Sequence, residues 1–112
     1  MNLRSAAFIA ALCAISWSLA VVLPAQAQDR GKQIYDTTCV ACHGKDGKGA
    51  LPGTPNLRKV MAKSDEDLVR NTLNGYQSPG SPLAMPPKGG NPSLTEADVR
   101  AVIQYMRSAF SR

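Results

Sequence analysis

The residues after position 27 contain too few apolar side chains to build a stable core unaided. Of these 85 residues, 29 are apolar, nine are glycine and seven are proline. Four are aromatic, namely Tyr35, Tyr76, Tyr105 and Phe110. Chains of this length bury a modest fraction of their surface and often depend on a disulfide, a metal or a cofactor. The sequence therefore predicts one small domain completed by a bound group, and it excludes a large α/β enzyme.

The first 27 residues have the pattern of an export signal. Arg4 supplies the positive charge, residues 6–23 are apolar apart from two serines, and Ala25-Gln26-Ala27 forms a small-x-small cleavage pattern. We expect cleavage after Ala27, which places a mature domain of residues 28–112 in the periplasm. A retained N-terminal anchor is the alternative. No stretch of 18 apolar residues follows, so we expect that the mature domain does not span a membrane.

Three segments have helical periodicity, and none alternates apolar and polar residues as a strand would. The first is residues 29–42. The second begins after Ser64, a good N-cap, and ends at Gly75. The third begins after Thr95, with Asp98 at the third helical position, as in a capping box. Its apolar face consists of Val99, Val102, Ile103, Met106 and Phe110.

The connections between these helices are long for so small a domain. Residues 44–63 and 75–93 are rich in glycine and proline and show no periodic pattern. Loops of this length are uncommon unless they are functional. We expect an all-α fold whose loops wrap a large flat cofactor.

The segment Cys39-Val40-Ala41-Cys42-His43 carries three side chains that can bind a metal or a cofactor. A structural disulfide gives no role to the histidine, and a thioredoxin-like redox pair needs a βαβ surround that is absent. A zinc site needs about four ligands, whereas residues 28–112 hold two cysteines and one histidine. The remaining interpretation is covalent attachment of haem c, with thioether bonds from Cys39 and Cys42 and His43 as an axial iron ligand.

At these residues the chain resembles the class I cytochromes c, and most closely the monohaem bacterial c5/c555-like group. The resemblance rests on Gly31 and Tyr35, the cysteine–histidine motif, Pro55-Asn56-Leu57 and Met85-Pro86-Pro87. It implies the class I cytochrome c fold, in which three main helices and long loops surround one covalently bound haem.

The resemblance also implies two contacts. Gly31 and Tyr35 are expected to cross the last helix closely, at Val102 and Tyr105. The carbonyl of Pro55 is expected to accept a hydrogen bond from the imidazole of His43, which would fix the ring orientation.

The second axial ligand is to be chosen among Met61, Met85 and Met106. Met106 lies on the apolar face of the last helix, so we expect it to pack in the core. Met61 precedes a helix start and could be core or surface. Met85 precedes two prolines that keep the chain extended, and residues 84–87 match the A-M-P-P pattern of the family that the chain resembles. We expect Met85 to be the ligand.

Histidine–methionine ligation favours ferrous iron and fills both axial positions, leaving no open site for a small molecule. We therefore expect an electron carrier between redox partner proteins and not an enzyme. Two alternatives stay open. One is a haem enzyme or gas-binding protein with an open sixth iron site, and the other is an electron-transfer subunit of a larger dehydrogenase or oxidase complex.

The basic charge suggests the chemistry of a partner. The chain has 13 Lys and Arg against 8 Asp and Glu, a net charge of +5. We expect Lys45, Lys48 and Lys88 to lie near the exposed cofactor edge, where they could steer an acidic redox partner; ordinary solvated lysines are the alternative. Nucleic-acid binding is not expected because no basic aromatic platform exists. A monomer is expected.

Overall fold

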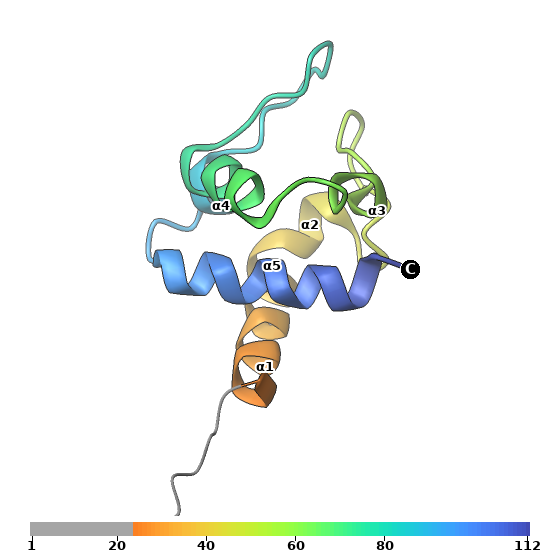
Figure 1. Ribbon diagram of the computed structural model, residues 1–112. Helices are drawn as coiled ribbons and strands as arrows, with labels where there is room; N and C mark the ends of the chain where they lie inside the picture. The colour runs from red at the N-terminus through yellow and green to blue at the C-terminus, as the bar shows by residue number, and fades with distance from the viewer. Residues whose placement is uncertain (1–23) are drawn as a thin grey trace, which may run out of the picture.

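The computed structural model describes residues 24–112, so most of the predicted export signal lies outside the described residues. The helical segments are α1 Pro24–Ile34, η1 Tyr35–Cys39, α2 Val40–His43, α3 Leu57–Val60, α4 Asp65–Asn74, η2 Pro87–Gly90 and α5 Glu96–Phe110. Extended pairing in this part of the chain is limited to one antiparallel bridge between Tyr76 and Met85. The all-α prediction is confirmed. Figure 1 shows α5 lying across α1 and below α4.

The first helical region is longer than the predicted residues 29–42 and is not uniform. α1, η1 and α2 follow one another without a break from Pro24 to His43, and η1 is a π-helical segment. The amide of Val40 donates to the carbonyl of Tyr35, five residues earlier. A π turn holds one residue more than an α turn and is frequent at functional sites. The π turn therefore rotates the residues after Tyr35 about the helix axis relative to the residues before it.

α1 and α5 cross at Gly31, where no side chain separates them. A Cβ atom on Gly31 would lie 2.8 Å from Cβ of Tyr105 and closer still to the carbonyl oxygen of Ala101. The ring of Tyr35 packs 5.6 Å from that of Tyr105 and 5.3 Å from that of Phe110, centroid to centroid. The predicted crossing is confirmed, and the atoms nearest to a Cβ on Gly31 belong to Ala101 and Tyr105.

Side-chain caps fix the starts of α4 and α5 where the sequence predicted them. The Ser64 hydroxyl accepts from the amide of Asp67 at 3.2 Å. At α5, Thr95 and Asp98 each accept from the other's amide at 3.1 Å, which completes the capping box. The five apolar residues predicted for the inner face of α5 are all buried. Caps of this kind contribute about 1 kcal/mol each.

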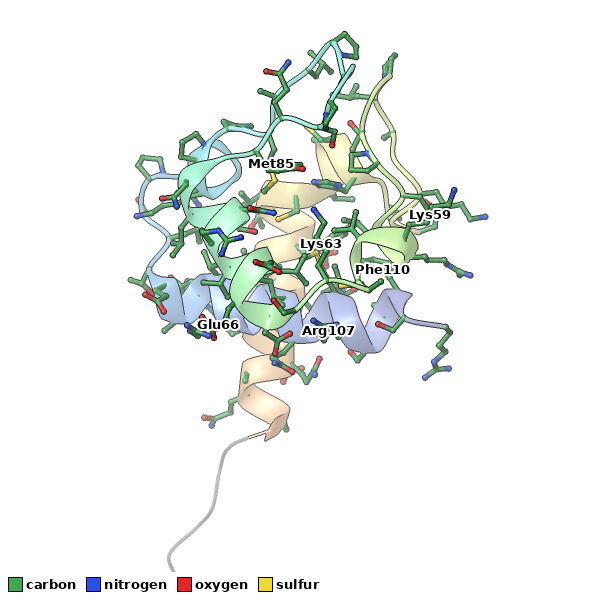
Figure 2. All side chains as sticks on the ribbon, turned by 45° about the horizontal axis from the view of Figure 1, so that its top comes forward. Lys59, Lys63, Glu66, Met85, Arg107 and Phe110 are labelled. Carbon is green, nitrogen blue, oxygen red and sulfur yellow. The ribbon has the colours of Figure 1, made fainter. Side chains whose placement is uncertain are left out.

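The loop 44–63 contains a short helix that the sequence analysis did not predict. Asn56 caps α3, since its side-chain oxygen accepts from the amide of Arg58 at 2.9 Å. Arg107 of α5 then holds the segment after α3, donating to the carbonyls of Met61 at 2.8 Å and Lys63 at 2.7 Å. Figure 2 shows Arg107 beneath this segment. The connection between α3 and α4 is therefore fixed against the C-terminal helix.

The close helix crossing gives a stability prediction. Gly31→Ala would place a methyl group against the Ala101 backbone, which cannot move without displacing α5. We expect a loss of about 2 kcal/mol or more in the free energy of unfolding, as found for overpacked sites. Denaturant unfolding of the purified protein measures it. Asp29→Ala, at an exposed position of the same helix, is the control, and an equal effect of both changes would contradict the prediction.

Candidate functional site

The helices and loops enclose a cavity of about 490 Å³. Its walls come from η1 and α2, from residues 51–63, from α4, from residues 76–89 and from α5. Most of the side chains that line it are apolar. A mainly apolar cavity with a few polar groups is typical of a cofactor or small-molecule site, and its volume is in the range of such sites.

The five residues that the sequence analysis selected all line this cavity: Cys39, Cys42, His43, Pro55 and Met85. The fold thus brings together three segments that are distant along the chain. Met61 and Met106 line the same cavity, and both are buried, whereas Met85 is half-buried. All three methionines therefore have access to a bound group, and the choice among them depends on how each is held.

His43 is the last residue of α2, and its ring is in an apolar setting. Its Nδ1 is buried and makes no hydrogen bond within residues 24–112. The predicted bond to the carbonyl of Pro55 is therefore not formed in this structure, and that role of Pro55 stays a prediction. Burial lowers the pKa of His43 below its usual 6.5. The ring is thus neutral at pH 7, which is the form that binds metals.

Cys39 and Cys42 are both free thiols. Burial raises the pKa of the Cys39 thiol to about 11, with a smaller contribution from Cys42. A raised pKa keeps Cys39 a thiol, whereas the reactive cysteine of a thioredoxin-like redox centre has a lowered pKa. No group of three or more His, Cys, Asp or Glu residues that could hold a metal occurs in residues 24–112. The donor set does not fit a zinc site.

Tyr35 fixes the end of the helix that carries His43. Its hydroxyl donates to the carbonyl of Gly44 at 2.5 Å. Burial raises the pKa of Tyr35, so the hydroxyl keeps its proton. The following loop folds back on α2, since Gly49 donates to the His43 carbonyl at 2.9 Å and Ala50 to that of Cys42 at 2.8 Å. The sequence analysis placed Tyr35 at the helix crossing, and no local pattern indicates this second contact.

Met85 is held from both sides of its loop. Its amide and carbonyl pair with the carbonyl and amide of Tyr76, at 2.7 and 3.0 Å. Beyond it, η2 packs on η1, where a Cβ on Gly89 would lie 3.1 Å from the methyl group of Thr38. Lys88 adopts φ +56°, a strained value of the kind that clusters at functional sites. Figure 2 shows the Met85 side chain pointing from its loop into the molecule.

Large exposed apolar side chains gather at the mouth of the cavity. Leu51, Tyr76 and Leu83 are 43%, 40% and 48% exposed, and all three belong to the cavity lining. Two lysines, Lys59 and Lys63, also line it, and the Lys63 ammonium lies 4.7 Å from the centre of the Tyr76 ring. Sequence reasoning did not select these five, because nothing along the chain shows that residues 51–63 and 76–83 meet.

The role predicted for three lysines at the cofactor edge stays a prediction. Lys45, Lys48 and Lys88 are not part of the cavity lining. Lys45 and Lys48 are exposed, and Lys88 is half-buried. They remain candidates for a surface beside the cavity, but Lys59 and Lys63 are closer to its wall.

The fold and the site define a class of protein. A helical chain encloses an apolar cavity, and one wall carries two free cysteines beside a histidine with an unpaired, buried nitrogen. These features fit a haem attached through a cysteine pair and ligated by the adjoining histidine. The site is that of a small protein that binds haem c.

Comparison with known proteins identifies the family. The cytochrome c family profile matches residues 28–110, so the chain belongs to the cytochrome c family and carries one covalently attached haem c. Cytochrome c-555 of Prosthecochloris aestuarii is 37% identical over 81 residues, 68% of this chain and 81% of that protein. Cytochrome c-555 of Chlorobaculum thiosulfatiphilum is 37% identical over 82 residues, 68% of this chain and 88% of that protein.

A larger relative contains a similar segment. The cbb3-type cytochrome c oxidase subunit CcoP of Rhodobacter capsulatus is 36% identical over 84 residues, 70% of this chain but 28% of that protein. In residues 24–112, no helix combines the length and the apolar composition that a bilayer crossing needs.

The contact between Tyr35 and Gly44 gives a prediction. Tyr35→Phe keeps the ring packing but removes the donor to the Gly44 carbonyl. We expect the free energy of unfolding to fall by about 1–2 kcal/mol, the usual cost of leaving a part-buried acceptor without its partner. Denaturant unfolding of the holoprotein measures it. Tyr105→Phe, at the neighbouring ring of the same aromatic cluster, is the control, and equal losses in both variants would contradict the assignment.

Proposed function

We propose that this protein is a periplasmic electron carrier whose haem is attached to Cys39 and Cys42 and ligated by His43 and Met85. The observation that carries this proposal is the convergence of these four side chains on one apolar cavity from two distant segments. The cytochrome c-555 relatives support the same function. The bound haem supplies reversible one-electron chemistry at its iron.

The chain's own residues would prepare that chemistry in three ways. The cysteine pair fixes the group to the end of the first helix. The neutral ring of His43 presents a nitrogen donor from a helix end that Tyr35 holds in place. The apolar lining excludes water, so a change of charge inside the cavity occurs in a low dielectric.

Met85 is the best candidate for the second axial ligand because of how the three methionines are held. Met106 lies on the buried face of α5 and Met61 follows α3, so both pack in the hydrophobic core. Met85 alone comes from an extended loop, which the Tyr76 bridge and the following prolines keep away from helical packing. A thioether ligand raises the reduction potential of the iron.

The surface at the cavity mouth is suited to a redox partner. Exposed Leu51, Tyr76 and Leu83 lie at the mouth of the cavity that would hold the haem, and Lys59 and Lys63 also line that cavity. An apolar centre with a charged margin is the usual anatomy of a transient protein interface. Such a margin steers an acidic partner, and the attraction weakens as salt screens it.

A second candidate function rests on the CcoP relationship. The matching segment makes up 28% of that oxidase subunit, so a domain like this one also occurs as part of a larger assembly. In that case this protein would carry electrons as a docked subunit and not as a free shuttle. Purification from its own cells under mild conditions separates the two, because a subunit copurifies with its complex in fixed proportion.

The periplasmic location rests on the export pattern of residues 1–27. Mass spectrometry of the secreted protein tests it. A chain beginning at Gln28 with one haem attached supports a cleaved signal, whereas a mass that includes Met1 supports a retained anchor.

Optical spectra of the exported protein test the proposed ligation. The oxidised wild-type protein should show the weak far-red band of methionine–ferric ligation, and the reduced protein should not bind carbon monoxide. Met85→Leu should keep the haem attached, lose the far-red band and bind carbon monoxide, because it removes the sulfur without emptying the site. Met61→Leu and Met106→Leu are volume-matched controls and should keep the band.

Other outcomes would overturn parts of the proposal. A far-red band that survives in Met85→Leu but disappears in Met61→Leu or Met106→Leu assigns the ligand to that other methionine. A wild-type protein that lacks the band and binds carbon monoxide supports an enzyme or gas-binding role. A protein without covalent haem contradicts the assignment of Cys39 and Cys42.

Electron-transfer kinetics test the basic surface. Oxidation of the reduced protein by ferricyanide, a multiply charged anion, should slow as ionic strength rises. Lys59→Glu reverses a charge in the cavity lining and Lys48→Glu reverses one of the predicted docking charges, so each should slow the reaction by about twofold or more at low salt. Lys32→Glu makes the same charge change on α1, where Lys32 pairs with Asp36, and should have a smaller effect. Equal slowing in all three variants would indicate that the rate depends on the net charge of the protein and not on the position of the lysine, which would contradict the prediction.

A further inference from the structure

The outer part of the cavity is formed by two loops that have little regular structure. The first loop comprises residues 44–56 and follows His43, and the second loop comprises residues 75–86 and carries Met85. The tips of both loops rise on the same side of the molecule, away from α5 (Figure 1), whereas Gly47 of the first loop packs on Phe110 of α5. His43, just before the first loop, and Met85, in the second loop, would bind the same haem. A contact that joins the loops would therefore control how firmly the haem is enclosed.

One hydrogen bond joins the two loops in the described part of the chain. The Ser81 hydroxyl donates to the carbonyl of Gly53 at 3.1 Å, across 28 positions of sequence. The same contact is tightly packed, because a Cβ on Gly53 would lie 2.7 Å from Cδ of Pro82 and 2.8 Å from the Ser81 oxygen. The first loop therefore presents its bare backbone to Ser81 at a point where no side chain would fit.

Ser81 also organises the loop that carries Met85. Its hydroxyl lies 2.8 Å from the carbonyl of Leu83 and accepts from the Leu83 amide at 3.3 Å. Its amide donates to Ser78 and its carbonyl accepts from the Gln77 side chain, both at 3.0 Å. The single hydroxyl proton is thus shared between the carbonyl of Leu83, two residues before Met85, and the carbonyl of Gly53 on the facing loop. This one side chain therefore hydrogen-bonds to the backbone of both loops.

We propose that Ser81 is a positioning residue that latches the Met85 loop to the loop following His43 and so limits how often the methionine leaves the iron. This inference rests on the proposed function, since it assumes that Met85 is the axial ligand. Met85 is held at its other side by the Tyr76 bridge. Loss of the latch should therefore loosen the ligand without releasing it.

The chain offers a matched set of variants. Ser81→Ala removes the hydroxyl, and Ser81→Thr retains one. Gly53→Ala leaves Ser81 intact but places a methyl group in the packed contact, at a residue with φ +81°. Gly80→Ala has nearly the same backbone cost at φ +76°, beside Ser81, but its methyl group would meet nothing within 4 Å. The difference between the two glycine variants isolates the contact between the loops from backbone strain.

The measurement is the rate at which imidazole binds to the oxidised holoprotein at saturating concentration. An added ligand can enter a six-coordinate site only after the protein ligand has left, so this rate reports how often Met85 departs. Ser81→Ala and Gly53→Ala should raise the rate by about two- to tenfold, the range expected for losing one hydrogen bond. Gly80→Ala and Ser81→Thr should stay close to wild type.

The results distinguish the proposed role of Ser81 from the proposed ligation by Met85. If the wild-type protein shows the far-red band but Ser81→Ala binds imidazole no faster, or Gly53→Ala is no faster than Gly80→Ala, the latch is wrong and the proposed function stands. If the wild-type protein lacks the band and takes up imidazole without delay, the methionine ligation fails and the latch fails with it. A general loss of stability would accelerate Gly80→Ala as well, and that result would also contradict the latch.

Discussion

The contact between α1 and α5 at Gly31 is the constraint on which the rest of the structure depends. Because a glycine backbone meets the carbonyl of Ala101, the two helices approach closely enough for three aromatic rings to pack beside the crossing. That cluster takes three of the four aromatic residues of the described chain and lies at the crossing, before the end of the first helical region. The segment with Cys39, Cys42 and His43 lies beyond that cluster and lines the cavity, and Cys39 also packs against the core.

The sparse apolar composition explains why that cavity exists. The buried residues form one cluster around α5, and no second cluster lies under the loops at residues 51–56 and 76–86. These loops gain little from packing on each other, so a large flat group between them supplies the contacts that their own side chains do not. The apolar cavity lining and the lack of buried side chains at residues 51–56 and 76–86 are two consequences of the same shortage of core residues.

The parts of the fold governed by local rules could be predicted from the sequence. Ser64 and Thr95 cap their helices as expected, and the apolar period of α5 identifies its buried face. The π turn at Tyr35 and the link from its hydroxyl to Gly44 depend on how α1 and α5 pack. That packing is tertiary, so no local pattern encodes them. Asn56 is a different case, because an asparagine before an apolar turn is a cap signal that the long-loop interpretation overlooked.

The candidate site shows the same division. The cysteine–histidine motif and the Met85 segment were found because short patterns carry their chemistry, and the fold brings both to one cavity. The exposed side chains at its mouth could not be found this way, since Leu51 and Leu83 have meaning only once the two loops meet. Exposed apolar residues are ordinary when scattered and informative when contiguous. Here all three of the large ones surround the opening of the cavity. The two loops that would enclose the cofactor thus also form the surface through which a partner would exchange electrons. The residues that hold these loops together therefore also shape that surface.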